Sequence, residues 1–287
     1  MTDPKTHTLE VPGATLTYDV REAEHSAAPT LLVFGSPMEA AAFGTLAGYL
    51  TDRTVVTLDP RGADRSTRTD TTTESTPELH ADDLHRLITE LGGPVDIFAT
   101  SGGAVNALAL VTAHPEQVRT LVAHEPPLTT ILPDHEQLRA AVEDIRATYQ
   151  RAGAGPGMAK FIALASVQGE VPADWADGPL PDPAEFGLPT EDDGSRDDVL
   201  LAQNLRTTTQ YEPDFDALRA ASTRIVPAAG IESAAEMPRR GAEALAARLH
   251  TDVALFPSGH GGFLGDEYGM PGEPEAFAAT LREILDR

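Results

Sequence analysis

Residues 96–110 read DIFATSGGAVNALAL, in which an apolar strand pattern runs through Ser101 and two glycines directly into an apolar helix pattern. Small residues around a serine at a strand–turn–helix junction allow the tight, strained turn of a nucleophile elbow. Ala99 stands where the usual G-x-S-x-G pattern has its first glycine, and Gly103 keeps the last. The segment predicts that Ser101 lies at the carboxyl end of a sheet, with the Gly102 N–H at a helix start. A second interpretation stays open, in which Ser101 only caps that helix.

Strand and helix patterns alternate on both sides of this segment. Apolar strand patterns occupy residues 30–34, 54–58, 95–99, 118–123, 224–229 and 252–256, and helical patterns occupy residues 40–50, 77–91, 102–113, 238–249 and 274–285. Strands that are apolar throughout and separated by helices indicate a mostly parallel sheet with helices on both faces, an α/β fold. Residues 9–20 alternate around Pro12 and Gly13, which predicts an N-terminal hairpin.

The alternation stops between residues 128 and 222, where the chain is helical and irregular. One helix face is marked by Leu138, Val142, Ile145 and Tyr149, and the glycines of residues 153–157 (GAGPG) are expected to end that helix. Residues 171–198 are rich in Pro, Asp and Gly, which predicts a long surface loop. One sheet interrupted by a helical insertion is the simplest architecture.

The composition restricts the function. The chain of 287 residues has 45 acidic and 21 basic residues, a formal net charge of -24. Such a surface repels phosphate backbones and anionic lipid, so we expect neither a nucleic-acid nor a membrane partner. The absence of cysteine excludes disulfides, thiolate metal sites and a cysteine nucleophile. No apolar run approaches the ~18 residues of a membrane span, and we expect a cytoplasmic protein.

Three further segments accompany the serine turn. FGSP (residues 34–37) follows the first central strand pattern, DPRGADRS (residues 59–66) follows the next, and FPSGHGGF (residues 256–263) follows the last. In this order and spacing the chain resembles the α/β-hydrolase fold family over nearly its whole length. Phe34 stands where the family usually has histidine before glycine, and Asp64 replaces a glycine.

The resemblance assigns Ser101 as nucleophile and His260 as general base, with the backbone N–H groups of Gly102 and Ser36 as the oxyanion hole. A serine hydroxyl is a weak nucleophile at neutral pH and needs an adjacent base. Among nine histidines, only His260 follows a predicted strand in a glycine-rich loop near the C-terminus. This position agrees with the chain order serine, acid, histidine.

The acid that orients His260 is less obvious. The family usually has an aspartate three residues after a glycine that closes the strand following the insertion, and counted from Gly230 this position is Ser233. Glu232 is one residue short of it. Glu125 ends the strand before the insertion, where some α/β-hydrolases, including certain haloalkane dehalogenases, look similar in carrying their acid. We favour Glu125 over Glu232, although Glu125 could also only accept hydrogen bonds from the turn that follows it.

The resemblance also implies two parts: a core domain of residues 1–127 and 223–287, and a helical cap of residues 128–222 over the serine. Candidate pocket residues are Met38, Trp175, Tyr211 and Phe263, each of which core packing explains equally well. Together they favour a small, largely apolar substrate.

The leading functional hypothesis is a serine hydrolase that cleaves an ester, lactone or thioester through an acyl-enzyme, without a cofactor or metal. A lyase, cyclase or cofactor-free oxygenase that uses His260 as base is the alternative, and a ligand-binding protein with a disabled triad is a third possibility. The oligomeric state is not predicted.

Two polar clusters are set aside. Residues 80–85 (HADDLH) look like a metal cluster, but His80 and His85 are five residues apart and do not share a helix face, so we predict a solvated helix. The acidic residues 191–198 are expected to form a surface loop. No phosphate-binding glycine motif follows a strand, so nucleotide binding has no support.

Overall fold

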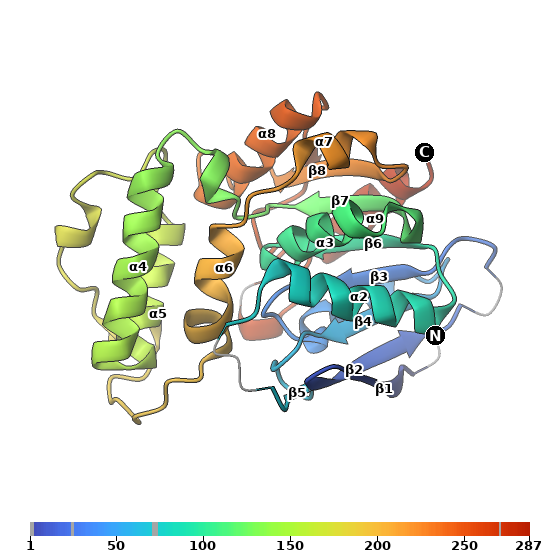
Figure 1. The fold of residues 1–287 in the computed structure, drawn as a ribbon. Coiled ribbons are helices and arrows are strands. Elements are labelled where there is room, and N and C mark those ends of the chain that lie inside the picture. Colours follow the sequence, from blue (N-terminus) through green and yellow to red (C-terminus); the bar gives the residue numbers. More distant parts are fainter. Residues whose placement is uncertain (1–2, 24–25, 71–73, 270) are drawn as a thin grey trace.

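The computed structural model describes residues 3–23, 26–70, 74–269 and 271–287. Across these ranges the strands form one sheet in the order β1-β2-β4-β3-β6-β7-β8-β9, with β5 beside β2 (Figure 1). The strands are β1 (Lys5–Val11), β2 (Ala14–Arg21), β3 (Leu31–Phe34), β4 (Val55–Asp59), β5 (Thr67–Arg68), β6 (Val95–Thr100), β7 (Val118–His124), β8 (Arg224–Gly230) and β9 (Ala254–Phe256). Strands β4, β3, β6, β7, β8 and β9 are parallel, which confirms the predicted mostly parallel sheet.

The N-terminal hairpin is also confirmed. β1 and β2 pair antiparallel with Leu9 opposite Leu16, and β2 joins the parallel strands through an antiparallel pairing with β4. Gly13 in the turn has φ +76°, and its Cβ position would lie 2.8 Å from Asp70 Cβ, so a side chain at this residue is disfavoured by both conformation and space.

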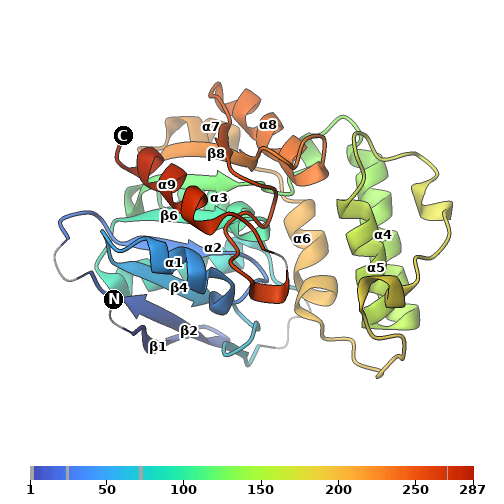
Figure 2. The same ribbon diagram turned by 180° about the vertical axis from the view of Figure 1, so that it is seen from behind.

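Helices cover both faces of the sheet. α2 (Pro77–Leu91), α3 (Gly102–Ala113), α7 (Phe215–Ala220) and α8 (Met237–Leu249) lie on the face seen in Figure 1, and α1 (Gly44–Tyr49) and α9 (Pro274–Leu285) lie on the face seen in Figure 2. Leu84, Leu108 and Leu218 belong to the buried cluster on the first face, and Phe43 and Phe277 belong to the cluster on the second. Burial of such side chains contributes roughly 1.5–3 kcal/mol each.

A third group of helices lies beyond the carboxyl ends of the parallel strands. It comprises α4 (His135–Ala152), α5 (Ala154–Ala165), the π-helix η6 (Val199–Asn204) and α6 (Leu205–Thr209) (Figure 1). These helices have a separate buried cluster that includes Leu138, Tyr149 and Leu201. The last helix of residues 128–222, α7, lies instead over the sheet, where Leu218 joins the main core. Residues 171–198 contain only the short 3₁₀ turns η4 (Trp175–Asp177) and η5 (Pro183–Phe186).

The glycines of residues 153–157 do more than end a helix. α4 does end before Gly153, but α5 begins at once and contains Gly155 and Gly157. A Cβ on Gly155 would lie 1.8 Å from Pro189 O, and one on Gly157 would lie 2.9 Å from Tyr149 Cβ. The glycines predicted a helix end alone, whereas α5 uses Gly155 and Gly157 for close packing.

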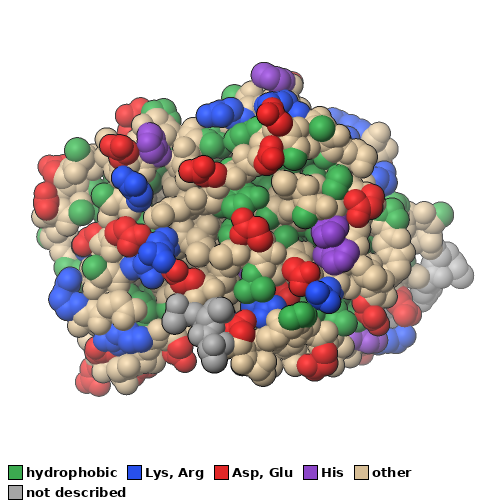
Figure 3. Space-filling view, viewed as in Figure 1, with side chains coloured by type: hydrophobic (Ala, Val, Ile, Leu, Met, Phe, Trp, Pro, Cys, Tyr) green, Lys and Arg blue, Asp and Glu red, His purple; other side chains and the backbone are tan. Residues whose placement is uncertain are grey.

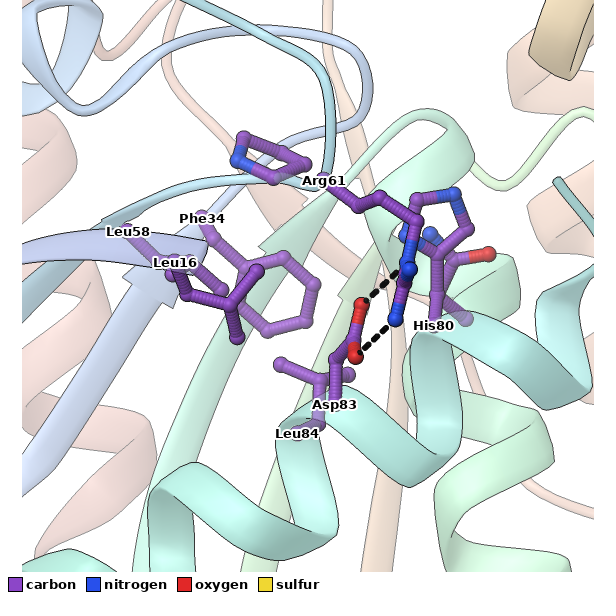
Figure 4. A pocket seen from close by; sticks show the side chains of 9 residues that line it. Leu16, Phe34, Leu58, Arg61, His80, Asp83 and Leu84 are labelled. Carbon is purple, nitrogen blue, oxygen red and sulfur yellow. Dashed lines mark hydrogen bonds and ion pairs between the residues drawn. The ribbon is translucent and has the colours of Figure 1, made fainter. Parts of the chain in front are cut away.

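The prediction that residues 80–85 form a solvated helix face is wrong. His80 and Asp83 are buried, because other parts of the chain meet α2 there. Arg61 donates to both carboxylate oxygens of Asp83, at 2.9 and 2.6 Å, beside a void of about 10 Å³ (Figure 4). His80 Nε2 lies 2.8 Å from Asn204 Oδ1. The segment therefore ties the π-helix and the loop after β4 to the core.

Charged side chains do not form one large patch on the face of Figure 3, where acidic groups are scattered among basic and apolar ones. Many of the acidic groups are paired, for example Asp82 with Arg86. Within the described ranges, no helix combines the length and apolar composition that a bilayer crossing needs.

Candidate active site

Ser101 lies in the turn between β6 and α3 with a strained backbone. Its φ of 54° and ψ of -131° fall in a region that residues other than glycine rarely adopt, at a cost of about 1–3 kcal/mol. The Ser101 side chain makes no capping hydrogen bond to α3, so the interpretation as a simple helix cap is wrong. The residue is partly exposed at the carboxyl edge of the sheet, as a nucleophile elbow requires.

Two glycines bring this turn against the loop that follows β3. A Cβ on Gly102 would lie 2.6 Å from Ser36 O, and a Cβ on Gly103 would lie 2.9 Å from the backbone of Gly35. Neither distance is possible for a side-chain carbon, so both glycines are required for this close approach. The N–H of Gly102, in the first turn of α3, has no acceptor within the helix and is available to an anion at the positive end of the helix dipole.

Glu125 and His260 are brought into direct contact. Glu125 follows β7 with φ 48°, is fully buried, and its Oε2 lies 2.5 Å from His260 Nδ1. Its other oxygen accepts a hydrogen bond of 2.9 Å from the N–H of Gly230. A carboxylate at Nδ1 favours the tautomer with the proton on that nitrogen, which leaves Nε2 as the basic atom. The His260 side chain as a whole is 36% exposed.

Ser101 is connected to this pair through the backbone. The Ser101 N–H donates to His124 O at 2.9 Å, and Glu125 is the next residue after His124. The serine, the glutamate and the histidine therefore share one edge of the sheet.

Glu232 and Ser233 take no part in this contact. Glu232 is exposed and accepts a hydrogen bond of 3.3 Å from the Ser258 hydroxyl. Ser233 is buried, and its hydroxyl has no hydrogen-bond partner among the described residues. Of the two glutamates considered from the sequence, the structure brings Glu125 to His260 and leaves Glu232 away from it.

The contact changes the pKa of both partners. Burial alone would raise the pKa of Glu125, but the hydrogen bond and charge of His260 outweigh it and lower this pKa to about 2. Burial alone would lower the pKa of His260, but the hydrogen bond and charge of Glu125 raise it above 6.5. Glu125 is therefore ionised at neutral pH and stabilises the protonated form of His260.

His124, which precedes Glu125 in the sequence and was not chosen as a site residue, lies beside His260. It is fully buried, its Nδ1 lies 3.0 Å from Thr100 Oγ1, and its ring centre lies 6.0 Å from that of His260. Burial lowers its pKa to about 4, so it is neutral beside the His260 imidazole. The sequence contained no periodic signal for this contact, because it joins the ends of neighbouring strands.

One group in the described part of the chain, His124, Glu125 and His260, has possible metal-ligand atoms within 4.8 Å of one another. Glu125 and His260 are already hydrogen-bonded to each other, and one His124 nitrogen is bonded to Thr100. These hydrogen bonds account for the proximity of the three side chains without a metal ion.

The four candidate pocket residues do not form one group. Met38 is half-buried over Gly35, whose Cβ position would lie 2.9 Å from Met38 Cβ. Trp175 packs against the buried cluster of the third group of helices, with Lys160 Nζ 5.8 Å from its ring centre. Tyr211 lines a surface groove at the start of α2.

Phe263 is fully buried against Phe43, with ring centres 5.1 Å apart, and offers no surface to a ligand. Its apolar character thus reflects core packing, the explanation that the sequence left open. Thr208 of α6 was missed: its Cγ2 lies 3.3 Å from the Cβ position of Gly102, so α6 contacts the serine turn directly.

Comparisons with known proteins show the family and the fold of this chain. A model of the alpha/beta hydrolase fold matches residues 35–181. The uncharacterized hydrolase YraK of Bacillus subtilis (strain 168) is 32% identical over 264 residues, which cover 89% of each chain. A thermophilic esterase from Thermogutta terrifontis has a TM-score of 0.67 at 20% identity, covering 99% of this chain and 98% of that one.

An enol-lactonase from Burkholderia xenovorans LB400 has a TM-score of 0.66 at 15% identity, covering 98% of this chain and 100% of that one. At these identities the two solved structures share the fold with this chain, and their chemistry is a property of those proteins.

Proposed function

This chain belongs to the α/β-hydrolase fold family, and on that premise we propose that it is a serine hydrolase that cleaves an ester, lactone or thioester of a small substrate. The observation that carries the proposal is the hydrogen bond between His260 and the buried Glu125, at the same sheet edge as the strained Ser101. This arrangement supplies a nucleophile, a base and a charge that stabilises the protonated base.

In the proposed first half-reaction, Ser101 Oγ attacks the substrate carbonyl carbon while its proton passes to His260 Nε2. The imidazolium is stabilised by the ionised Glu125, and the carbonyl oxygen becomes an oxyanion that accepts hydrogen bonds from the N–H groups of Gly102 and Ser36. Collapse of this intermediate breaks the bond to the leaving group, which takes the proton from His260. The acyl group remains on Ser101.

The second half-reaction repeats these steps with water. His260 removes a proton from a water molecule, the resulting hydroxide attacks the acyl carbon, and the ester bond to Ser101 breaks. The serine recovers its proton from His260 and the carboxylic acid leaves.

Residues 128–222 are proposed to act as a cap that limits the substrate size. The contact of Thr208 with the Gly102 turn supports this role, because α6 then forms one wall of the site. Met38, half-buried against Gly35 in the loop that contacts the Gly102 turn, is proposed as an apolar part of the site. A small, mostly apolar acyl compound of the cytoplasm fits these walls better than a polymer.

The proposal is tested with p-nitrophenyl esters of two to eight carbons and with a matched thioester series. Wild-type protein is expected to hydrolyse the short esters with a pre-steady-state burst if deacylation is slower than acylation. Ser101→Ala is expected to lower turnover by about 10⁴-fold or more, because nucleophile and base act as a unit. Residual activity of Ser101→Ala within tenfold of wild type, at an unchanged melting temperature, would contradict the proposal.

A further inference from the structure

Asp59, at the carboxyl end of β4, is a buried carboxylate with both oxygens occupied. Its Oδ1 accepts a hydrogen bond of 2.6 Å from the backbone N–H of Ala40, and its Oδ2 accepts one of 2.6 Å from Arg65 Nε. The side chain has no exposed surface. The hydrogen bond from Ala40 joins the end of β4 to the loop that follows β3.

That loop, residues 35–39, contains Ser36. It leaves β3 at Phe34 and ends at Ala40, the first residue of the 3₁₀ turn η1 (Ala40–Phe43). Along its first part the loop rests on the serine turn, where Gly102 and Gly103 allow backbone contact with Ser36 and Gly35. At its far end, the N–H of Ala40 is held by Asp59.

Arg65 holds the Asp59 carboxylate in place through the contact at Oδ2. The same guanidinium donates to both oxygens of Asp19 on β2, at 3.2 and 3.0 Å. The hydrogen bonds that Arg65 donates to Asp19 and Asp59 raise the pKa of its guanidinium above the ordinary value. The Ser66 hydroxyl donates to Asp59 O at 2.7 Å, so the backbone of Asp59 is held as well.

We propose that Asp59 is a positioning residue, which orients the Ser36 N–H in the oxyanion hole by holding the end of residues 35–39. The inference rests on the proposed serine hydrolase mechanism. An oxyanion donor is effective only when it lies about 2.7–3.1 Å from the developing charge. A small movement of the loop therefore reduces stabilisation of the transition state more than it reduces the affinity for the substrate. Asp59 therefore acts on kcat, through the loop, without touching the substrate.

The experiment compares Asp59→Asn with Asp19→Asn. Both substitutions keep the side-chain shape and remove one anionic partner of Arg65, but only Asp59 contacts the loop. In Asp59→Asn an amide must place its oxygen toward Ala40 N–H and its NH₂ group toward Arg65, or the reverse, and both choices set two donors against each other.

Asp59→Asn is expected to lower kcat by about 10- to 100-fold with little change in KM, since removal of an oxyanion donor costs about 10²–10³ in kcat. The affinity for a trifluoromethyl ketone, whose adduct with Ser101 places an oxyanion in the same hole, is expected to fall by the same factor. Asp19→Asn is expected to keep both quantities within twofold of wild type. The melting temperatures of both variants measure how much the loss of one Arg65 partner lowers stability.

Equal kcat values for the two variants would overturn the inference, as would a fall in kcat without a fall in ketone affinity. If Asp59→Asn does not fold, Arg65→Gln is measured instead, and the same parallel loss of kcat and ketone affinity is expected at a smaller size. Failure of the hydrolase proposal is recognised separately, because wild-type hydrolysis would then be unaffected by Ser101→Ala.

Discussion

Glu125 reaches His260 from the strand that precedes the helical insertion, with 2.5 Å between Oε2 and Nδ1. The strand that follows the insertion contributes Gly230, whose N–H donates to the other oxygen of the same carboxylate. The acid is therefore fixed by two neighbouring strands. At Ser233, where the family usually has its acid, the buried hydroxyl has no hydrogen-bond partner in the part of the chain that the structure describes.

Glu125→Gln is expected to lower ester turnover by 10²–10⁴-fold, because the neutral amide no longer stabilises the imidazolium or its tautomer. Glu232→Gln serves as the control, since Glu232 is exposed and bonded to Ser258. It is expected to remain within threefold of wild type. Steady-state kinetics of both variants, with circular dichroism as a check on folding, measure the difference. The opposite pattern would show that Glu232 is the acid.

The pH dependence of kcat/KM follows from the pKa of His260. Because Glu125 raises this pKa above 6.5 and the base must be neutral, the acid limb of the profile is expected to have an apparent pKa above 6.5. In Glu125→Gln the charge that favours imidazolium is gone, so the acid limb is expected to move to lower pH. An apparent pKa below 6 for the wild-type acid limb would contradict this electrostatic coupling. The same apparent pKa in wild type and Glu125→Gln would also contradict it.

Gly103→Ala is expected to impair both stability and activity. The new methyl group would lie 2.9 Å from the backbone of Gly35, so the loop containing Ser36 must move. A loss of about 1–3 kcal/mol in the free energy of unfolding is expected, with reduced kcat. Gly48→Ala in α1 is the control: its Cβ position has no atom within 4 Å, and a gain of about 0.5–1 kcal/mol is expected. Equal effects of the two substitutions in urea unfolding would refute the packing argument.

Stability is expected to fall in mild acid because His80 is buried in its neutral form. Burial lowers the pKa of His80 to about 4, whereas an unfolded histidine titrates near 6.5. Well above pH 6.5, His80 is neutral in both the folded and the unfolded protein, and its contribution to stability is fully present. Between pH 6.5 and about 4 only the unfolded state gains the proton, so stability falls by at most about 1.4 kcal/mol per pH unit for this residue.

His80→Gln, which keeps a donor for Asn204, is expected to flatten this pH dependence. His250→Asn is the matched control, because His250 is exposed and its left-handed backbone tolerates asparagine. Free energies of unfolding from urea titrations at several pH values measure the slope. An unchanged slope in His80→Gln would contradict the role of His80.

The fold was predictable wherever the signal was local. The strand patterns, the hairpin around Gly13 and the turn at Ser101 each depend on a few consecutive residues, and the structure has all of them. The site was predictable to the extent that it follows strand ends, since carboxyl ends of parallel strands share an edge. Strand-end positions, together with the resemblance to the α/β-hydrolase fold family, predicted that Ser101, Glu125 and His260 belong to one site.

Contacts between distant segments were not predictable. His80 and Asp83 looked solvated because Arg61 and Asn204, which bury them, are remote in the sequence. Phe263 was a candidate pocket residue because its partner, Phe43, was not known to be beside it. The contact of Thr208 with Gly102 depends on how α6 packs, which no periodicity in a five-residue helix encodes.

Intact-mass measurement of the wild-type protein after treatment with a fluorophosphonate tests the nucleophile most directly, with peptide mapping to locate the adduct. Wild-type protein is expected to gain one phosphonyl group, at Ser101 alone, and Glu125→Gln is expected to react more slowly at the same serine. Ser101→Ala is expected to gain none. Absence of an adduct on folded wild-type protein, or an adduct of equal yield on Ser101→Ala, would contradict the assignment of Ser101 as an activated nucleophile.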